Sequence, residues 1–527
     1  MFSRYFLVVF YVSILLGASF AASQNMIKDD FRVNSNGSGF EHRLPDIDMD
    51  TTGNCCIVWE ILRDTDYDIY AQRFDCEGEF SGESFLVNDQ SLKNQKNPSI
   101  AKIPSGEFLI VWQDLKNGNY DIYAQLFEFS GDTIGINFII NDDPGTSSQQ
   151  EPDCDFGSVF VVCWMDKRGG SEDIFMQLFD SLGNKVNSNL KVNDDSDSVQ
   201  IRPKVATNLS GNFVVVWQDK REGDYDIYAQ RFDSLGNSLG SNFKINDDFS
   251  SSYQGFPKVD MDSSGNFVVV WQDQREGYYD VYAQFYNRLG QGMSSNFVVN
   301  DDTGSSYQGH PDVAMSSEGN FIVVWEDKRN GDSDIYAQRY DSTAHAQGGN
   351  YRVNGDFGSF EQTEPSAATD GQRICFVWQD NRLGGTDIFA KVVEWGWTDI
   401  REQVEMENPQ KNIMLFQNYP NPFNPFTTIS FTVHGERKSE NGSIPITQKS
   451  VYGSQFMVHS PIHTTLTIYN VLGQRVRTLV NEEKTPGYHQ VIWDGKDDKG
   501  KEVASGIYFY KLKTKEYTKI KRMLLLR

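Results

Sequence analysis

A short apolar segment that ends in Trp occurs seven times along this 527-residue chain, at intervals of 52 to 54 residues. An internal repeat of this regularity predicts a repeat architecture, in which each unit is one supersecondary structure. The alternative, a row of separate small β-domains, is disfavoured because a unit of about 50 residues is marginal as an independent core. The repeated residues are Trp59, Trp112, Trp164, Trp217, Trp271, Trp325 and Trp378.

Each repeat carries the signals of four short strands separated by Gly, Asn and Asp turns. An Asp opens a second strand nine residues after every Trp, a third strand ends in Val-Asn or Ile-Asn, and a fourth begins at a Pro. The Trp segments, such as Phe213 to Trp217, are apolar at both parities, so both faces of that strand must be covered. Four-stranded sheets stacked around an axis meet this requirement. The sequence therefore predicts an all-β fold, with a seven-bladed β-propeller over residues 24–394.

The two ends of the repeat region predict how the ring closes. The first third-strand motif, Phe31 to Asn34, precedes every Trp, and the last Trp unit, residues 365–394, is followed by none. The N-terminal strand at 31–34 is therefore expected to complete the seventh blade and to remove a free sheet edge.

The hairpin after each Trp follows the pattern Trp-x-Asp-x-Arg-x-Gly-x-x-Asp, as in Trp217, Asp219, Arg221, Gly223 and Asp226. This pattern resembles the TolB-type propeller repeat, which implies the fold and little about activity. An acidic and basic pair in nearly every blade favours bracing of the turn, because a catalytic site would have to differ between blades. The same reasoning favours a structural role for a recurrent Gln-x-x-Pro motif.

The turn after each Trp and the connection after each Asn are predicted to emerge at one end of the propeller. That end gathers carboxylates and Tyr side chains, which suit sugar rings or a Ca²⁺ held by oxygen ligands. The alternative is a solvated acidic rim whose aromatic rings pack over turns. No Asp-x-Asp-x-Asp-Gly calcium loop is present, and no other cofactor is indicated. The candidate ligand-binding residues are Tyr67, Tyr120, Tyr225, Tyr253, Tyr279, Tyr307, Asp248 and Asp302.

Composition narrows the function without choosing a ligand. A net charge of -25 disfavours nucleic acid as a partner, because phosphate recognition needs clustered Lys and Arg. The chain has only seven His, no His-Glu-x-x-His motif, and many carboxylates of which no pair stands out as catalytic. We expect a binding role for a polysaccharide or protein ligand. A polysaccharide-acting hydrolase and a non-catalytic scaffold are the alternatives.

The C-terminal part differs in pattern and charge. Residues 395–414 break the repeat and predict a linker, whereas 415–527 show short alternating strands that predict a small Ig-like β-sandwich. This stretch resembles the C-terminal sorting domain of the type IX (Por) secretion system and its FlgD-like Ig-fold relatives. The resemblance implies export across the outer membrane with the secretion machinery as partner; a plain Ig-like spacer is the alternative. The motifs that carry it are Asn418 to Pro425, Tyr469 to Gln474, Trp493-Asp494-Gly495, Ser505 to Tyr508 and Lys521 to Leu526.

The N-terminus has the pattern of a secretory signal peptide over residues 1–21. Arg4 precedes an apolar run from Tyr5 to Leu16, and Ser19 and Ala21 place small residues at a cleavage site. No later stretch is long and apolar enough to span a membrane. The signal peptide predicts export by the Sec pathway. The resemblance of residues 415–527 implies a bacterial protein that then crosses the outer membrane and is secreted or attached to the outer surface. The six Cys lack zinc-binding spacing, and their pairing cannot be assigned.

Overall fold

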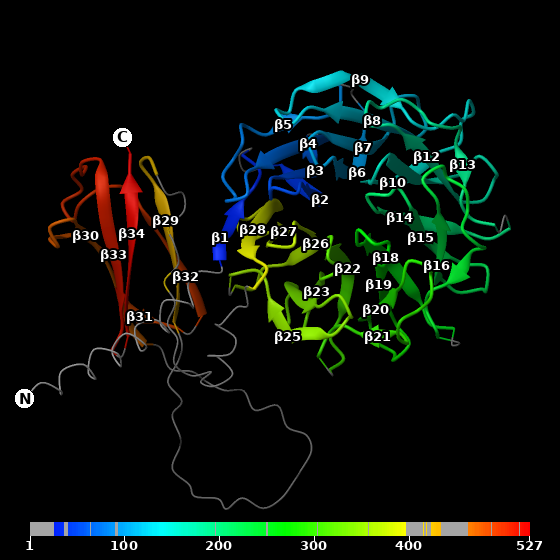
Figure 1. Ribbon diagram of the computed structural model, residues 1–527. Helices are drawn as coiled ribbons and strands as arrows, with labels where there is room; N and C mark the ends of the chain where they lie inside the picture. The colour runs from blue at the N-terminus through cyan, green and yellow to red at the C-terminus, as the bar shows by residue number, and fades with distance from the viewer. Residues whose placement is uncertain are drawn as a thin grey trace, which may run out of the picture. The chain divides into compact units, whose positions relative to one another are not determined.

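The computed structural model describes two compact units, which are treated separately below (Figure 1). The described residues are 26–396, apart from 36–39, 64, 90–92, 195–196, 249–250, 303 and 357, and 415–526, apart from 416–417, 419–422, 434–461, 486 and 516. Every regular element among them is a strand. The predicted signal peptide, most of the predicted linker and the polar segment before β30 (Ile462–Asn470) lie outside the described residues.

Seven four-stranded sheets follow one another around a ring in chain order (Figure 1), which confirms the predicted seven-bladed propeller. Within each blade the strands run antiparallel from the centre outward. Blade 1 holds β2 (Glu41–Met49), β3 (Cys55–Arg63), β4 (Asp66–Phe74) and β5 (Phe85–Leu86). Blade 2 holds β6 (Gln95–Lys102), β7 (Phe108–Asp114), β8 (Asp121–Phe127) and β9 (Thr133–Ile139). Blade 3 holds β10 (Gln149–Phe156), β11 (Phe160–Asp166), β12 (Asp173–Phe179) and β13 (Leu190–Lys191).

The remaining blades repeat this plan. Blade 4 holds β14 (Gln200–Thr207), β15 (Phe213–Asp219), β16 (Asp226–Phe232) and β17 (Phe243–Lys244). Blade 5 holds β18 (Gln254–Met261), β19 (Phe267–Asp273), β20 (Asp280–Tyr286) and β21 (Phe297–Val298). Blade 6 holds β22 (Gln308–Met315), β23 (Phe321–Asp327), β24 (Asp334–Tyr340) and β25 (Ala346–Arg352). Blade 7 holds β26 (Gln362–Thr369), β27 (Arg373–Asp380), β28 (Asp387–Glu394) and, as its outer strand, β1 (Met26–Arg32).

The repeated Trp side chains fill the spaces between neighbouring blades. All seven have no exposed surface, and each lies in a cluster with apolar residues of the preceding blade. Trp217 of blade 4, for example, packs with Val161 and Cys163 of blade 3, and Trp59 of blade 1 packs with Val377 of blade 7. Both faces of every Trp strand are therefore buried, as the doubly apolar sequence requires.

The N-terminal strand closes the ring on the last blade. Phe31 pairs with Ala390 and Arg32 with Phe389. The position of Lys391 in the other six blades is occupied by Gln, and in five of them its side-chain oxygen accepts a hydrogen bond from an Asn of the outer part of the blade. In blade 7 the outer strand supplies Asp30 instead, and Lys391 forms an ion pair with it.

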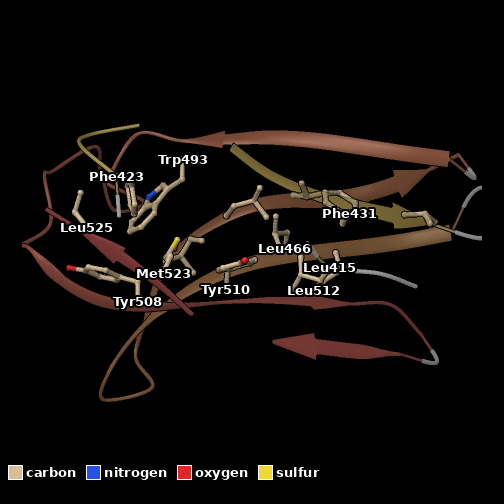
Figure 2. Packing of buried hydrophobic residues seen from close by; sticks show 14 residues of the cluster. Leu415, Phe423, Phe431, Leu466, Trp493, Tyr508, Tyr510, Leu512, Met523 and Leu525 are labelled. Atoms are coloured by element: carbon tan, nitrogen blue, oxygen red, sulfur yellow. The ribbon is translucent and has the colours of Figure 1, made fainter. Parts of the chain in front are cut away.

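The second unit is an Ig-like β-sandwich of two sheets. One sheet pairs β29 (Thr427–Val433) with β32 (Gly487–Trp493), and the other has the order β31 (Arg475–Lys484), β30, β33 (Gly506–Lys513) and β34 (Thr518–Leu525). Figure 2 shows Trp493, Tyr510 and Phe431 among the side chains that fill the space between them, and all three are fully buried. The backbone N–H of Asn418 donates to the Tyr510 hydroxyl over 2.9 Å, which ties Asn418 to this core.

Candidate functional site at the channel mouth

The loops that were predicted to share one end of the propeller do so. The N–H of Gln149, at the start of β10, donates to the carbonyl of Tyr120 in the turn after β7 over 2.7 Å. Arg168, in the turn after β11, pairs with Asp142 in the connection between blades at 2.8 Å. The turns that follow the second strands and the connections between blades therefore form a common surface, called the loop end below.

The repeated Asp and Arg residues brace these turns. Asp219 accepts hydrogen bonds from the Trp217 indole N–H at 2.8 Å, from the backbone N–H of Arg221 at 2.9 Å and from its guanidinium at 2.7 Å. The Asp219 side chain is fully buried. A carboxylate whose lone pairs are filled in this way is positioned for structure rather than for chemistry on a ligand.

Asp248 and Asp302 orient the Gln residues of the innermost strands. Gln254 donates to Asp248 over 3.0 Å, and Gln308 donates to Asp302 over 3.1 Å. The oxygen of Gln254 accepts from Asn246 of the preceding blade over 3.3 Å, so this Gln links two blades. The two Asp residues predicted to bind a ligand thus lie at the loop end, beside the amides of Gln254 and Gln308.

Four of the six predicted Tyr residues form a continuous row, called the tyrosine ladder below. Ring centroids are 6.0 Å apart for Tyr225 and Tyr253, 6.1 Å for Tyr253 and Tyr279, and 5.7 Å for Tyr279 and Tyr307, each pair edge to face. Such contacts contribute about 0.5–1.5 kcal/mol each beyond buried area. The ladder crosses blades 4, 5 and 6.

Tyr67 and Tyr120 lie at the loop end in blades 1 and 2, at the chain positions that correspond to Tyr225 and Tyr279. Lys96 sits 3.8 Å from the centroid of the Tyr67 ring. Tyr120 is half-buried, and its burial, reinforced by the charge of Glu60, raises the pKa of its hydroxyl. Tyr67 and Tyr120 therefore lie outside the ladder, because they belong to blades 1 and 2 and the ladder lies on blades 4, 5 and 6.

A second set of residues, not identified from the sequence, surrounds the opening of the central channel at the loop end. One residue in each blade, directly before the repeated Pro, has a left-handed backbone with φ between 45° and 55°. These seven residues line a cavity of about 500 Å³. They are called the mouth residues below: Leu44, Asn97, Glu151, Arg202, Phe256, His310 and Glu364.

The unusual backbone of the mouth residues is held from the neighbouring blade. In five blades the residue that follows the Trp reaches across and accepts a hydrogen bond from a mouth N–H, for example Gln218 from Phe256 at 3.0 Å and Glu326 from Glu364 at 2.8 Å. Because a left-handed non-Gly residue is costly, such a bond helps to retain it. The backbone of these mouth residues is therefore held in place, whereas the type of side chain differs from blade to blade.

The tyrosine ladder runs into the channel mouth. Tyr307 lies 6.4 Å from the His310 ring, His310 lies 4.3 Å from the Phe256 ring, and the Arg202 guanidinium lies 3.8 Å from the Phe256 centroid. The Tyr307 hydroxyl donates to Gln272 over 3.0 Å. Burial, followed by the charges of Glu326 and Glu364, raises the pKa of Tyr307, so it remains a neutral hydrogen-bonding group.

Deeper in the channel, the innermost strands present rings of charge. Lys204 pairs with Asp153 at 2.8 Å and Lys258 with Asp312 at 3.1 Å. One layer further, Asp48, Asp155 and Asp260 alternate around the axis, and each accepts a backbone N–H from the next blade over 2.6 Å. Burial, together with mutual repulsion of Asp48 and Asp155, raises the pKa of Asp48 to about 7.

Seven sheets around a channel with an asymmetric mouth define a β-propeller protein, and its C-terminal unit has an Ig-like fold. Residues 441–517 match the FlgD Ig-like domain family. The match supports the FlgD-like part of the resemblance noted for the sequence. No curated protein matches the chain.

Solved propeller structures are similar at low identity. A protein of unknown function from Dyadobacter fermentans is 11% identical, with a TM-score of 0.43, and the match covers 69% of this chain and 98% of that one. The α-L-arabinofuranosidase of Fusarium graminearum, in complex with an iminosugar inhibitor, is 12% identical with a TM-score of 0.42, covering 61% and 98%. The NanB sialidase of Streptococcus pneumoniae is 11% identical with a TM-score of 0.41, covering 70% of each chain. None of these similarities bears on what this chain binds.

Proposed function

We propose that this protein is an exported propeller that binds polysaccharide at its loop end. The observation that carries the proposal is the continuous tyrosine ladder, which leads over three blades into the channel mouth. Aromatic rings with polar edges pack against the apolar faces of sugar rings, and fixed polar groups beside them select the hydroxyls. Within the part of the propeller that the structure describes, this row lies on three of the seven blades, so the blades are not equivalent at the loop end.

The polar groups beside the ladder suit an uncharged or mixed polar ligand. The amide of Gln218 donates to the Tyr253 hydroxyl over 3.3 Å, and the oxygen of Gln272 accepts from Tyr307. At the mouth, Arg202 and Glu364 add one donor group and one acceptor group from blades 4 and 7. Donors and acceptors alternate with aromatic rings, which is the pattern that sugar binding requires.

The test is binding of a panel of soluble polysaccharides by the full chain, measured by calorimetry. We expect Tyr253→Ala and Tyr279→Ala each to weaken binding at least tenfold. Tyr67→Ala and Tyr120→Ala are the controls, because both remove a Tyr outside the ladder from the loop position that Tyr279 occupies in blade 5. Equal losses in ladder and control variants, or no binding by the parent protein, would contradict the proposal. Release of reducing sugar in the same samples would identify a hydrolase instead.

The C-terminal unit supports export as part of the proposed function. Its Ig-like fold buries two of the residues that carry the sorting-domain resemblance, Trp493 and Tyr508. We propose that this unit is recognised by the type IX machinery after Sec-dependent passage of the inner membrane. Deleting residues 415–527 should abolish delivery to the surface or medium in the native host, and unchanged delivery would refute this part.

A further inference from the structure

Three ionisable side chains from blades 6 and 7 meet at one point of the channel mouth. The residue after Trp is Gln in blades 2, 4 and 5, where its amide oxygen accepts a mouth N–H. In blade 6 the same position is Glu326, which still accepts the N–H of Glu364. The flanking mouth residues are His310 in blade 6 and Glu364 in blade 7, the only adjacent mouth pair with an imidazole beside a carboxylate.

The three side chains converge on each other. His310 Nδ1 lies 2.8 Å from Glu326 Oε1 and 3.7 Å from Glu364 Oε1. One donor atom of each residue lies within 4.8 Å of the other two. The Glu326 side chain is 6% exposed and that of His310 is 24% exposed, whereas Glu364 is 36% exposed and faces the mouth.

Structure alone does not call for a carboxylate at Glu326. The amides of Gln218 and Gln272 satisfy the equivalent backbone N–H without a charge. A buried Glu next to a second Glu places two negative charges where desolvation and repulsion are both unfavourable. The nearby cations Arg202 and Lys258 also have other partners, since Arg202 stacks on Phe256 and Lys258 pairs with Asp312.

We propose that His310, Glu326 and Glu364 bind a divalent transition-metal ion, with Zn²⁺ as the representative cation. One imidazole nitrogen and two carboxylate oxygens form a donor set that Zn²⁺ accepts in sites with three protein ligands. Tetrahedral coordination needs donor atoms roughly 3.3 Å apart, which lies between the two separations at His310 Nδ1. Ca²⁺ fits less well because it takes six to eight oxygen ligands.

The surroundings hold these ligands in place. Phe256 and Tyr307 pack on the His310 ring, and the backbone of His310 and of Glu364 is fixed by bonds to the post-Trp residues Gln272 and Glu326. Three protein ligands leave one coordination position, which would face the mouth cavity, where a water or a ligand hydroxyl could occupy it. The inference goes beyond polysaccharide binding and does not depend on it.

The experiment uses the full chain after treatment with a chelator, and the probes are Zn²⁺ alone by calorimetry and Co²⁺ by visible absorption. Every variant carries a residue that another blade already has at the same position, so the fold is preserved. His310→Asn matches Asn97, and Glu326→Gln matches Gln272. Glu60→Gln is the control, because Glu60 is the post-Trp residue of blade 1 and has Leu44 and Asn97 as its flanking mouth residues.

We expect one saturable Zn²⁺ site per chain, weakened at least tenfold by His310→Asn and by Glu326→Gln and unchanged by Glu60→Gln. The Co²⁺ spectrum should be lost in the same two variants. Absence of saturable binding, or equal affinity in the parent and both site variants, overturns the proposal. Because no sugar is present, these results are independent of the polysaccharide test.

Discussion

Lys391 Nζ lies 2.8 Å from Asp30 Oδ1, and this pair joins the last blade to the N-terminal strand. The Lys391 side chain is fully buried, and that of Asp30 is 8% exposed. Burial alone would raise the pKa of Asp30, but the charges of Lys391 and Arg382 outweigh it and hold this pKa below its usual value. Without Lys391, the buried Asp30 keeps its ion pair with Arg382 at 2.9 Å but loses a charged hydrogen-bond donor.

Lys391→Met should therefore destabilise the propeller by about 1.5–3 kcal/mol, as expected for the loss of a hydrogen bond between charged groups. Lys167→Met is the control, because Lys167 pairs with Glu172 at the surface, and it should cost less than about 1 kcal/mol. Chemical denaturation of both variants measures the difference. Equal costs would mean that the closing strand is held by its backbone pairing alone.

The indole N–H groups of the repeated Trp residues differ in one blade. Trp271 Nε1 donates to Asp273 over 2.7 Å, whereas Trp59 Nε1 is buried without a partner, because blade 1 has Ile61 where the others have Asp. Trp271→Phe should cost about 1–3 kcal/mol more than Trp59→Phe, since only the former removes a hydrogen bond. Thermal unfolding of the two variants under identical conditions tests this ranking.

In blade 3 the acceptor of the mouth N–H is not the residue that follows the Trp. Its post-Trp residue is Met165, and Glu151 Oε2 accepts the N–H of Arg202 at 2.9 Å in its place. Glu151→Ala should destabilise the protein by about 1–2 kcal/mol, because a half-buried N–H loses its acceptor. Met165→Gln should restore most of this loss in the double variant, as judged by a double-mutant cycle. If the free-energy changes of the two substitutions are strictly additive, Gln at position 165 does not replace Glu151 as the acceptor of the Arg202 N–H.

The carboxyl groups of the channel predict an unusual pH dependence. Burial and the charge of Asp155 raise the pKa of Asp48 to about 7, although the backbone N–H and the ammonium group of Lys102 oppose the shift. A raised carboxyl pKa stabilises the folded state at low pH, and this contribution is lost as the pH rises from about 4 to about 7.

The free energy of unfolding of Asp48→Asn, relative to that of the parent, should therefore rise by about 1–2 kcal/mol between pH 4.5 and pH 8. This value is smaller than the full pKa shift implies, because it is discounted for solvent screening. Asp50→Asn gives the opposite sign. Burial there is outweighed by hydrogen bonds from Thr52 and by Lys102, so the pKa of Asp50 is lowered and its contribution is lost as the pH falls below about 4. Unfolding curves at several pH values distinguish the two cases.

Much of the fold was predictable because the determinants are local and repeated seven times. The doubly apolar Trp strand, the Asp nine residues later and the Pro of the innermost strand recur in register, and β1 pairs with β28 where the unmatched motif Phe31 to Asn34 indicates. The candidate site was predictable in part. Tyr225, Tyr253, Tyr279 and Tyr307 lie together, whereas Tyr67 and Tyr120 lie on blades outside the row.

The mouth residues left only a weak signal in the sequence. The residue before each Pro varies among Leu, Asn, Glu, Arg, Phe and His within an otherwise regular repeat, and that variation marks the positions where the blades differ. Nothing in the chain order shows that these residues adopt left-handed backbones around one opening. The hydrogen bonds that hold them, such as Gln218 to Phe256, come from another blade.

The sequence by itself determined the blade count, the strands of each blade and the Ig-like C-terminal unit, because strand and turn preferences act over a few residues and hydrophobic patterning sets which faces are buried. Only the tertiary structure decided which side chains meet across blades. His310, Glu326 and Glu364, and the Tyr pairs of the ladder, are brought together by closure of the ring, which places residues from different repeats side by side irrespective of their separation along the chain.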